Sequence, residues 1–250
     1  MARRIIIPAR YASTRLPQKM LLDIAGKPML QHVWEKAVSC QFDSVLIATD
    51  DQRIANAAQT WGANVCMTDI KHSTGTDRLA EAFEKMGYAK EDVIVGVQGD
   101  EPLIPVENIV QVAKNCERHP DAAMATLCER MTQLKDIMDP NIVKVVRDKN
   151  GYAMYFSRGP IPWDRAKFPA ELPAQMDNLQ HIGIYCYRGA FLHRYANLER
   201  SPLEQIEALE QLRVLWHGLK IHVDIAGTHN PPGVDTQEGL ERVRKLFFFI

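Results

Sequence analysis

The chain contains no apolar run that could cross a membrane, because none approaches the roughly 20 residues that a spanning helix needs. It also lacks an excess of charge, since 30 basic and 31 acidic side chains leave a net charge of −1. This balance gives no electrostatic reason to expect nucleic acid or an anionic membrane as a partner. The amino-terminal Met1-Ala2-Arg3-Arg4 is followed by only three isoleucines before a proline, so no signal peptide is expected.

Cysteine is scarce, and its five positions are odd in number, widely spaced and mostly inside apolar segments: Cys40, Cys66, Cys116, Cys128 and Cys186. This pattern argues against a disulfide framework and against a zinc site. It predicts reduced core thiols in a cytoplasmic protein. The apolar fraction of 46% and charged fraction of 24% are those of an ordinary globular protein, and 250 residues allow one large domain or two small ones.

In the first half of the chain, short apolar stretches alternate with amphipathic ones. The apolar stretches predict strands at 5–7, 44–48, 64–67 and 93–97, and the amphipathic stretches predict helices at 29–40, 51–61, 76–86 and 106–117. Strands that are apolar on both faces and alternate with helices indicate a parallel sheet covered on both sides. We therefore expect an α/β fold with a Rossmann-like, doubly wound and mostly parallel sheet.

The second half has a different pattern. Strands are predicted at 124–127, 143–147, 153–156 and 183–187, with turn residues between them, so the sheet should have a smaller mixed or antiparallel extension. Ser201 as a cap, Pro202 at the first position and Glu204 three residues after the serine predict a helix over 201–217. A strand at 221–225 and a helix at 236–247 follow.

A cluster of cations follows the first predicted strand. Open α/β sheets bind ligands at the carboxyl ends of their strands, and Arg10, Arg15 and Lys19 should lie there. Guanidinium groups offer paired donors and an ammonium group offers a compact charge, so together they suit a nucleoside triphosphate. A solvated basic loop is the alternative, but the bracketing Pro8 and Pro17 and the position after a strand favour a binding loop.

Two aspartates are candidate metal ligands. Asp100 comes just after the strand 93–97, beside the expected triphosphate loop, and its carboxylate could hold Mg²⁺ or simply cap a turn. Asp235 could be a second ligand, or it could be the N-cap of the last helix, with Glu238 three residues further on. Glu101 could be a third acid of the site, although the prolines around it suit a structural turn equally well.

The cationic run resembles the signature P-A-R-x-x-S-x-R-L-P-x-K-x-L of the cytidylyltransferases that activate 3-deoxy-D-manno-octulosonate (Kdo) as CMP-Kdo for bacterial lipopolysaccharide. Further stretches similar to that family recur in order over nearly the whole chain: His72-Ser73-Thr74-Gly75-Thr76-Asp77-Arg78-Leu79, Val97-Gln98-Gly99-Asp100-Glu101-Pro102, Tyr155-Phe156-Ser157-Arg158, His181-Ile182-Gly183-Ile184-Tyr185, Leu209-Glu210-Gln211-Leu212-Arg213 and Gly233-Val234-Asp235-Thr236. Sugar-nucleotide pyrophosphorylases also pair an early arginine with a lysine. Their loop is typically glycine-rich, whereas this one has no glycine between Pro8 and Ala25.

The resemblance implies a Mg²⁺-dependent reaction in which CTP and Kdo give CMP-Kdo and pyrophosphate. The implied catalytic residues are Arg10, Arg15, Lys19, Asp100 and Asp235, with Asp100 and Asp235 as the metal ligands. The implied nucleotide-binding residues are Ala9, Arg10, Ser13, Arg15, Lys19, Gly75, Arg78 and Gln98. The implied acceptor-binding residues are Arg158, His181, Tyr185, Glu210 and Gln211.

Several of these residues also have plainer interpretations. Arg78 could be a surface residue on its helix, His181 a hydrogen-bonded histidine near the core, and Gln211 part of a polar helix face. In the family the loop commonly reads Gly-Lys-Pro where this chain has Gln18-Lys19-Met20, so the path of the backbone near the lysine is open. Acceptors other than Kdo also stay open: 8-amino-Kdo, or a sialic acid. A sugar-nucleotide binding protein without activity is the alternative from another class.

The implied roles divide the chain into a nucleotide-binding part over 1–120, an acceptor-binding and dimerisation part over 121–225, and a closing segment over 226–250. The predicted helix 201–217 is apolar on more than one face, which is more than packing on a single sheet requires. Together with the resemblance, this predicts a homodimer.

Overall fold

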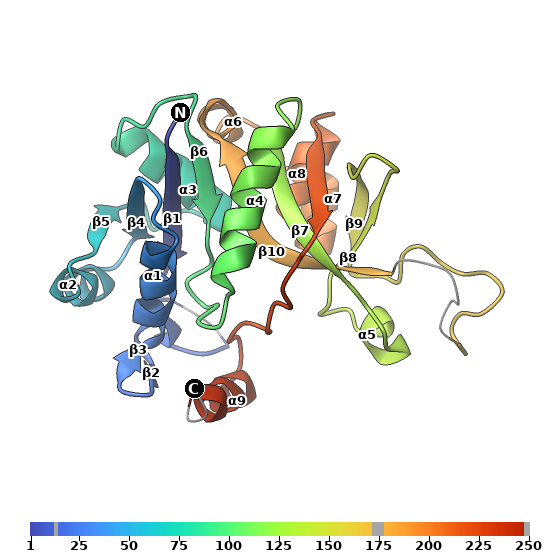
Figure 1. Ribbon diagram of the computed structural model, residues 1–250, viewed down its shortest axis with the longest axis horizontal. Coiled ribbons are helices and arrows are strands. Elements are labelled where there is room, and N and C mark those ends of the chain that lie inside the picture. Colours follow the sequence, from blue (N-terminus) through green and yellow to red (C-terminus); the bar gives the residue numbers. More distant parts are fainter. Residues whose placement is uncertain (13–14, 172–177, 248–250) are drawn as a thin grey trace.

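The computed structural model describes residues 1–12, 15–171 and 178–247, and a nine-stranded sheet runs through its centre (Figure 1). A short hairpin of β2 (Asp23–Ile24) and β3 (Lys27–Pro28) is separate from it. The strands of the large sheet are β1 (Arg3–Ala9), β4 (Ser44–Thr49), β5 (Asn64–Met67), β6 (Val93–Gly96), β7 (Met124–Arg130), β8 (Lys144–Arg147), β9 (Ala153–Ser157), β10 (Leu179–Arg188) and β11 (Ile221–Ile225).

The first half of the sheet is parallel. β1 pairs with β4 on one side and with β6 on the other, and β5 continues the sheet beyond β4. The chain therefore runs outward from β1 to β5 and then returns to the opposite side of β1. At such a switch point the loops leaving the strands separate, and a crevice opens at the carboxyl ends of β1 and β6.

Helices bury both faces of this sheet (Figure 1). In β1, Ile5 and Ile7 belong to the core on one face and Ile6 to the core on the other, and all three are fully buried. The first core is shared with α1 (Met29–Ser39), α2 (Gln52–Thr60), α4 (Val106–Arg118) and α9 (Gln237–Phe247), and the second with α3 (Gly75–Lys85), α6 (Gly189–Tyr195), α7 (Pro202–Glu207) and α8 (Gln211–Trp216). The predicted doubly wound α/β fold is confirmed.

The second half of the chain extends the same sheet with mixed directions, as predicted. β10 runs antiparallel between β6 and β7, and β11 is parallel to β7. β8 pairs with the first residues of β10 and forms an antiparallel hairpin with β9. The sheet is continuous across residue 120, so the two predicted parts share one sheet. Their functional division stays a prediction.

The single helix predicted over 201–217 is wrong. Its start is as expected, because Ser201 Oγ accepts the Glu204 N–H at 3.0 Å. However, α7 ends at Glu207, Ala208 adopts the left-handed conformation with φ 51° and ψ 50°, and α8 begins only at Gln211. Alanine favours helices and the apolar pattern continues through the break, so the sequence did not reveal it. The sequence also gave no indication of α5 (Leu134–Met138), α6 or the 3₁₀ turn η1 (Lys19–Leu21).

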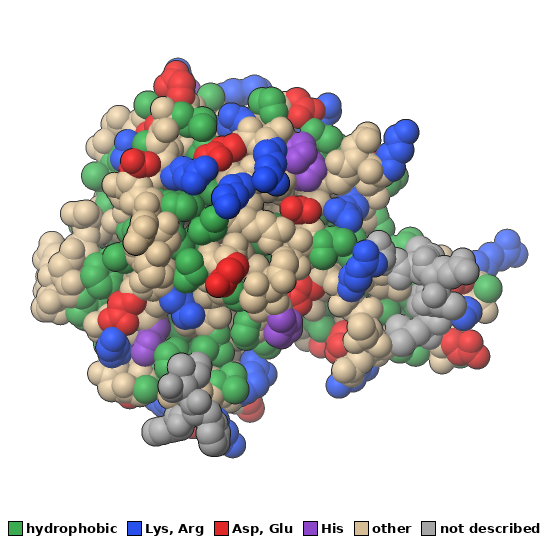
Figure 2. Space-filling model, viewed as in Figure 1, with side chains coloured by type: hydrophobic (Ala, Val, Ile, Leu, Met, Phe, Trp, Pro, Cys, Tyr) green, Lys and Arg blue, Asp and Glu red, His purple; other side chains and the backbone are tan. Residues whose placement is uncertain are grey.

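All five cysteines carry free thiols, and only Cys40 is partly exposed. Over the described ranges, no helix combines the length and the apolar character needed to cross a bilayer. Lys, Arg, Asp and Glu side chains are interspersed over the face of the molecule seen in Figure 2.

Candidate active site

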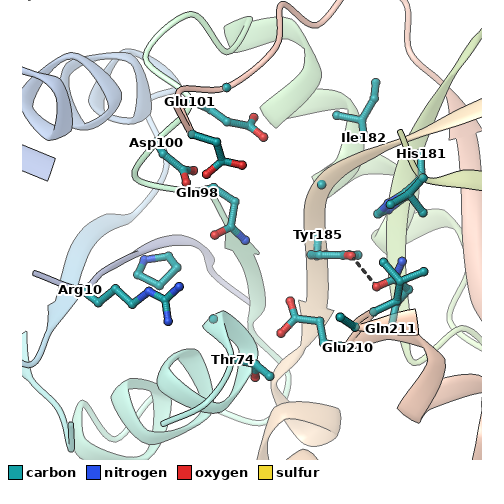
Figure 3. Close-up of a pocket in the computed structure, with 18 of the residues that line it drawn as sticks. Arg10, Thr74, Gln98, Asp100, Glu101, His181, Ile182, Tyr185, Glu210 and Gln211 are labelled. Carbon is teal, nitrogen blue, oxygen red and sulfur yellow. Dashed lines mark hydrogen bonds between the residues drawn. The ribbon is translucent and has the colours of Figure 1, made fainter. Parts of the chain in front are cut away.

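A cavity of about 710 Å³ opens at the carboxyl ends of β1 and β6. In the close-up of Figure 3, Arg10, Gln98, Asp100 and Glu101 lie on one side, and His181, Tyr185, Glu210 and Gln211 lie on the other. The sequence-predicted residues that line the cavity are Ala9, Arg10, Arg15, Lys19, Gly75, Arg78, Gln98, Asp100, His181, Tyr185, Glu210, Gln211 and Asp235. Ser13 lies outside the described residues.

Two glycines allow close backbone approach around the acids: Gly233 against the segment of Asp100, and Gly99 against the end of β1. A Cβ at Gly233 would lie 3.1 Å from the carbonyl oxygen of Asp100, and one at Gly99 would lie 3.1 Å from the carbonyl oxygen of Pro8. Both distances are too short for a side chain without movement of the backbone. The segments are also joined directly, because the Val234 N–H donates to the Asp100 carbonyl at 2.8 Å. Asp100 and Asp235 therefore face the same point although they are far apart in sequence.

Lys19 occupies the space between these two aspartates. Its Nζ lies 2.5 Å from Asp100 Oδ2 and 2.9 Å from Asp235 Oδ1, and Arg15 adds a bond of 3.1 Å to the other oxygen of Asp235. Burial alone would lower the pKa of Lys19, but the two carboxylates outweigh it and raise the pKa above its usual value. For Asp235, burial acts to raise the pKa, but Lys19 and Arg15 lower it overall. The lysine is thus held as a buried cation between two anions.

The plainer interpretation of Asp235, as the N-cap of the last helix, does not hold. The cap is the next residue, because Thr236 Oγ1 accepts the Gly239 N–H at 3.1 Å. The carboxylate of Asp235 instead turns into the cavity and pairs with cations. Gln18, before the lysine, has φ 59°, a left-handed conformation that glycine adopts at less cost. This explains why a glycine in the related motif suits this turn.

The two aspartates fit a magnesium ion that binds together with a nucleotide. Mg²⁺ is typically held by one or two carboxylates plus the phosphates of the substrate. A single cation, the Lys19 ammonium, already lies within 3 Å of both carboxylates, so one ion can reach both. In the described parts of the chain, no group of three or more histidine, cysteine or acidic side chains could hold a metal. The two carboxylates themselves suit an ion whose remaining ligands come from a substrate's phosphates.

The wall formed by β1, β6 and the start of α3 carries the residues predicted for the nucleotide. The Gly75 backbone approaches the Gln98 side chain, and a Cβ at Gly75 would lie 3.6 Å from Gln98 Oε1. Arg78 is only 3% exposed and donates to Asp50 at 2.6 Å and to Thr68 at 2.5 Å. Its interpretation as a surface residue is therefore wrong. Arg10 is exposed and has no hydrogen bond or ion pair within residues 1–12, 15–171 and 178–247, so its guanidinium is available to a ligand.

The opposite wall consists of buried polar side chains from β10 and α8. Tyr185 OH donates to Gln211 Oε1 at 3.1 Å, and both residues are at most 5% exposed. The Nε2 of Gln211 is buried and has no partner in the described structure. His181 Nε2 lies 2.9 Å from Thr126 Oγ1, and burial lowers the pKa of the imidazole to about 3. This wall offers neutral donors and acceptors, and the hydrogen-bonded interpretation of His181 is compatible with a place in the cavity.

Glu210 connects the two walls. Its Oε2 accepts the Thr76 N–H at 3.3 Å, at the start of α3. Burial raises the pKa of Glu210, while hydrogen bonds from Thr76 and Thr74 counteract part of the rise. The carboxylate thus satisfies an N–H group at the amino end of the helix that carries Gly75 and Arg78, while it also lines the cavity.

A network of buried ion pairs also connects the nucleotide-side wall of the cavity to the opposite wall. Arg213 donates from Nε and Nη2 to the Glu204 carboxylate at 2.8 and 2.6 Å, and from Nη1 to Asp77 at 3.2 Å. Both Arg213 and Glu204 are 2% exposed. Because Asp77 lies on α3, these contacts join the nucleotide wall to the helix pair that carries Glu210 and Gln211.

Arg158 is not among the described residues that line the cavity. Its backbone N–H and its Nε donate to Glu207, and its Nη1 donates to the Pro140 carbonyl at 3.0 Å. These bonds hold it behind the wall, and its contact with the acceptor stays a prediction. The cavity is also lined by residues that the sequence did not indicate, among them Asn141, Arg200 and Asn230. Of these three residues, only Asn230 could have been suspected from the sequence, because it lies in the proline-rich stretch just before the Gly233-Val234-Asp235 motif.

Glu101 also lines the cavity. Its Oε2 is buried without a partner among the described residues, while its backbone forms the expected turn. Burial raises the pKa of Glu101 to about 8, with further contributions from Asp100 and Asp235 and an opposing hydrogen bond involving Asn230. Glu101 can therefore be both part of a structural turn and a third acid beside the cavity.

Glu101 should make the metal-free protein less stable as the pH rises from about 5 to 8. Over that range the unfolded chain loses the proton of Glu101 while the folded protein keeps it, so the folded state binds more protons and stability falls with pH. One such group changes the free energy of unfolding by at most about 1.4 kcal/mol per pH unit. Urea unfolding of Glu101→Gln should show a weaker fall than wild type, whereas the exposed control Glu91→Gln should follow wild type. If the free energy of unfolding fell equally with pH in Glu101→Gln and in wild type, the raised pKa of Glu101 would be contradicted.

Comparison with known proteins agrees with this geometry. The chain matches the family model described as Cytidylyltransferase over residues 4–221. A 3-deoxy-manno-octulosonate cytidylyltransferase from Nitrosococcus oceani is 54% identical over 250 residues, which cover 98% of this chain and 96% of the relative. The protein of the same name from Francisella tularensis subsp. holarctica is 54% identical over 243 residues, which cover 97% of each chain.

Solved structures give the same result. A structure of CMP:2-keto-3-deoxy-manno-octonic acid synthetase complexed with CTP has a TM-score of 0.91 and 40% identity, over 100% of this chain and 99% of that chain. A structure of 4-diphosphocytidyl-2C-methyl-D-erythritol synthase has a TM-score of 0.64 and 15% identity, over 98% of each chain, and shows a shared fold alone. The predicted family is confirmed, and this chain belongs to the cytidylyltransferases, among the 3-deoxy-manno-octulosonate cytidylyltransferases.

Proposed function

We propose that this chain joins CTP to Kdo, forming CMP-Kdo and pyrophosphate for lipopolysaccharide biosynthesis. The observation that carries the proposal is the arrangement of the cavity, in which a wall of cations and acids faces a wall whose central side chains, His181, Tyr185 and Gln211, are uncharged. The charged wall suits a triphosphate and its metal ion, and the neutral wall suits the hydroxyl groups of a sugar. The 54% identity to proteins named for this reaction supports the same assignment.

In the reaction, the anomeric hydroxyl oxygen of the sugar attacks the α-phosphorus of CTP. The bond from that phosphorus to the bridging oxygen breaks, pyrophosphate leaves, and the hydroxyl proton passes to solvent. Such phosphoryl chemistry depends on positioning and on charge neutralisation. Arg10 and Arg15 would neutralise the triphosphate, and Asp100 and Asp235 would hold Mg²⁺. The ion would neutralise phosphate charge and lower the pKa of the attacking hydroxyl, so that no side chain is needed as a general base.

On the acceptor side, the protonation states of the buried groups determine what they can offer. The pKa of Tyr185 is raised by burial, so its hydroxyl keeps its proton, and the imidazole of His181 stays neutral. Gln211 Nε2 is a buried donor without a partner among the described residues, and such a donor costs free energy. A sugar hydroxyl or carboxylate would supply the missing acceptor.

Pyrophosphate release from CTP should be fast with Kdo and should distinguish it from other acceptors. We would compare Kdo with 8-amino-Kdo, a sialic acid and hexose 1-phosphates in the presence of Mg²⁺. The highest kcat/KM is expected for Kdo. A preference for 8-amino-Kdo or sialic acid would replace the acceptor but keep the reaction class, and no release with any acceptor would favour the non-catalytic alternative.

Asp100→Asn and Asp235→Asn should each lower turnover by at least about 100-fold, the upper end of what losing a supporting residue costs at a metal site. An amide is a poor ligand for a hard cation, and neither change alters side-chain size. Glu91→Gln is the control, because it removes a charge just before β6, at the opposite end of the strand from Asp100. Near wild-type turnover of either aspartate variant at saturating Mg²⁺ would show that the metal ligands are wrongly assigned.

We also propose a homodimer in the cytoplasm. Free thiols at all five cysteines are compatible with a reducing compartment. Large apolar side chains are exposed in the second half of the chain, including Ile206 at 80%, Met154 at 66% and Trp216 at 55%. Ile206 and Trp216 lie on α7 and α8, which make up the helical segment predicted to support dimerisation.

Sedimentation of the wild type should give a dimer at micromolar concentration. Ile206→Glu and Trp216→Glu should shift the equilibrium toward monomer, because a charge would be buried at the interface. Val38→Glu is a matched control, since Val38 is an exposed apolar residue of α1 in the first half of the chain. A wild-type monomer at tens of micromolar would rule the dimer out.

A further inference from the structure

The ammonium group of Lys19 occupies the place between Asp100 and Asp235 where a magnesium ion is also expected to bind. Its Nζ bonds to one oxygen of each aspartate, at 2.5 and 2.9 Å, and also lies 3.5 Å from the Val234 carbonyl. The side chain is only 8% exposed, so its charge has little access to water. A buried charge of this kind is stable only when it is paired, and here two carboxylates pair with it.

The same two oxygens cannot serve Lys19 and a magnesium ion at once. Magnesium binds oxygen at about 2.0–2.1 Å and needs near-octahedral space around it. The ammonium group fills the space between Asp100 Oδ2 and Asp235 Oδ1. Without any cation there, two carboxylates would face each other beside the buried acid of Glu101, which is unfavourable.

We propose that Lys19 is an exchangeable internal counter-ion, which neutralises Asp100 and Asp235 in the nucleotide-free protein and releases them when phosphates bind. This inference rests on the proposed function, because it takes the aspartates as the metal ligands. Lys19 lines the same cavity as Arg10 and Arg15, and its flexible stem allows the ammonium to move from carboxylates to phosphates. The phosphates thereby give Lys19 a second set of partners.

Two consequences follow from this exchange. In the absence of nucleotide, Lys19 opposes metal binding, because the ion must displace a buried charge that would be left unpaired. When CTP binds, that cost disappears, so nucleotide and metal each increase the affinity of the protein for the other. Arg15 does not have this effect to the same degree, because it contacts only Asp235 and is 65% exposed.

The exchange can be tested by metal binding without catalysis. We would titrate nucleotide-free protein with Mn²⁺ and measure the free ion by its electron paramagnetic resonance signal. Lys19→Met, which keeps the length of the side chain but removes its charge, should bind Mn²⁺ more tightly than wild type by about 5-fold to 150-fold, the usual range of a coupling between sites. Arg15→Met should change the affinity less. A non-hydrolysable CTP analogue should tighten Mn²⁺ binding strongly in wild type and weakly in Lys19→Met.

A thermal measurement covers the case in which the lysine variant folds poorly without metal. In EDTA, Lys19→Met should melt at a lower temperature than wild type, and Mg²⁺ should restore it, whereas the wild type should respond little to Mg²⁺ alone. Equal Mn²⁺ affinity of wild type and Lys19→Met, with no Mg²⁺-dependent melting in the variant, would overturn the exchange. If Lys19→Met/Asp235→Asn bound Mn²⁺ as tightly as Lys19→Met, the metal assignment itself would fail, which is a separate result from failure of the exchange.

Discussion

An ammonium group held between two carboxylates joins three segments that are far apart in the sequence. Lys19 comes from the loop after β1, Asp100 from the loop after β6, and Asp235 from the segment before α9. The ammonium of Lys19, only 8% exposed, would be costly to bury without the two carboxylates. The close backbone approach at Gly99 and Gly233 is what makes the pairing possible, and the rest of the charged wall is arranged around it.

The opposite wall is organised by a different constraint. Its groups are buried polar side chains: β10 positions His181 and Tyr185, and the break between α7 and α8 positions Glu210 and Gln211. Glu210 and Arg213 connect this wall to the start of α3. The cavity is therefore enclosed by elements that are fixed to each other by charged contacts, and a ligand that spans it meets a largely preformed site.

Much of the fold was predictable because its signals are local. Buried strands such as β1 and β6 are apolar on both faces, and helices such as α4 have a clear amphipathic pattern, so the doubly wound sheet followed from the sequence. The left-handed residue Ala208 was not predictable, because alanine normally favours a helix and only tertiary packing imposes that conformation.

The residues of the site could be predicted from the sequence only in part, and most of their contacts could not. Position after a strand indicated Arg10 and Asp100, and the family resemblance indicated Asp235, but nothing in the sequence placed Lys19 between the two acids. The contacts that hold Arg158 behind the wall were also hidden, since they are made to backbone and side-chain groups of Pro140 and Glu207. Asn141 lines the cavity because of the tertiary packing of the second half of the chain, and no local sequence pattern predicts this.

The close approach at Gly233 also determines when the site can exist during synthesis. A ribosome delivers the chain in order, and domains begin to fold as they emerge. The parallel strands and Lys19 are available early, and Asp100 follows, but the segment that carries Gly233 and Asp235 emerges only after β11 has been made. A nascent chain that lacks this segment therefore has no Asp235, and the pocket for the charged ligand can be completed only after nearly the whole chain has been synthesised.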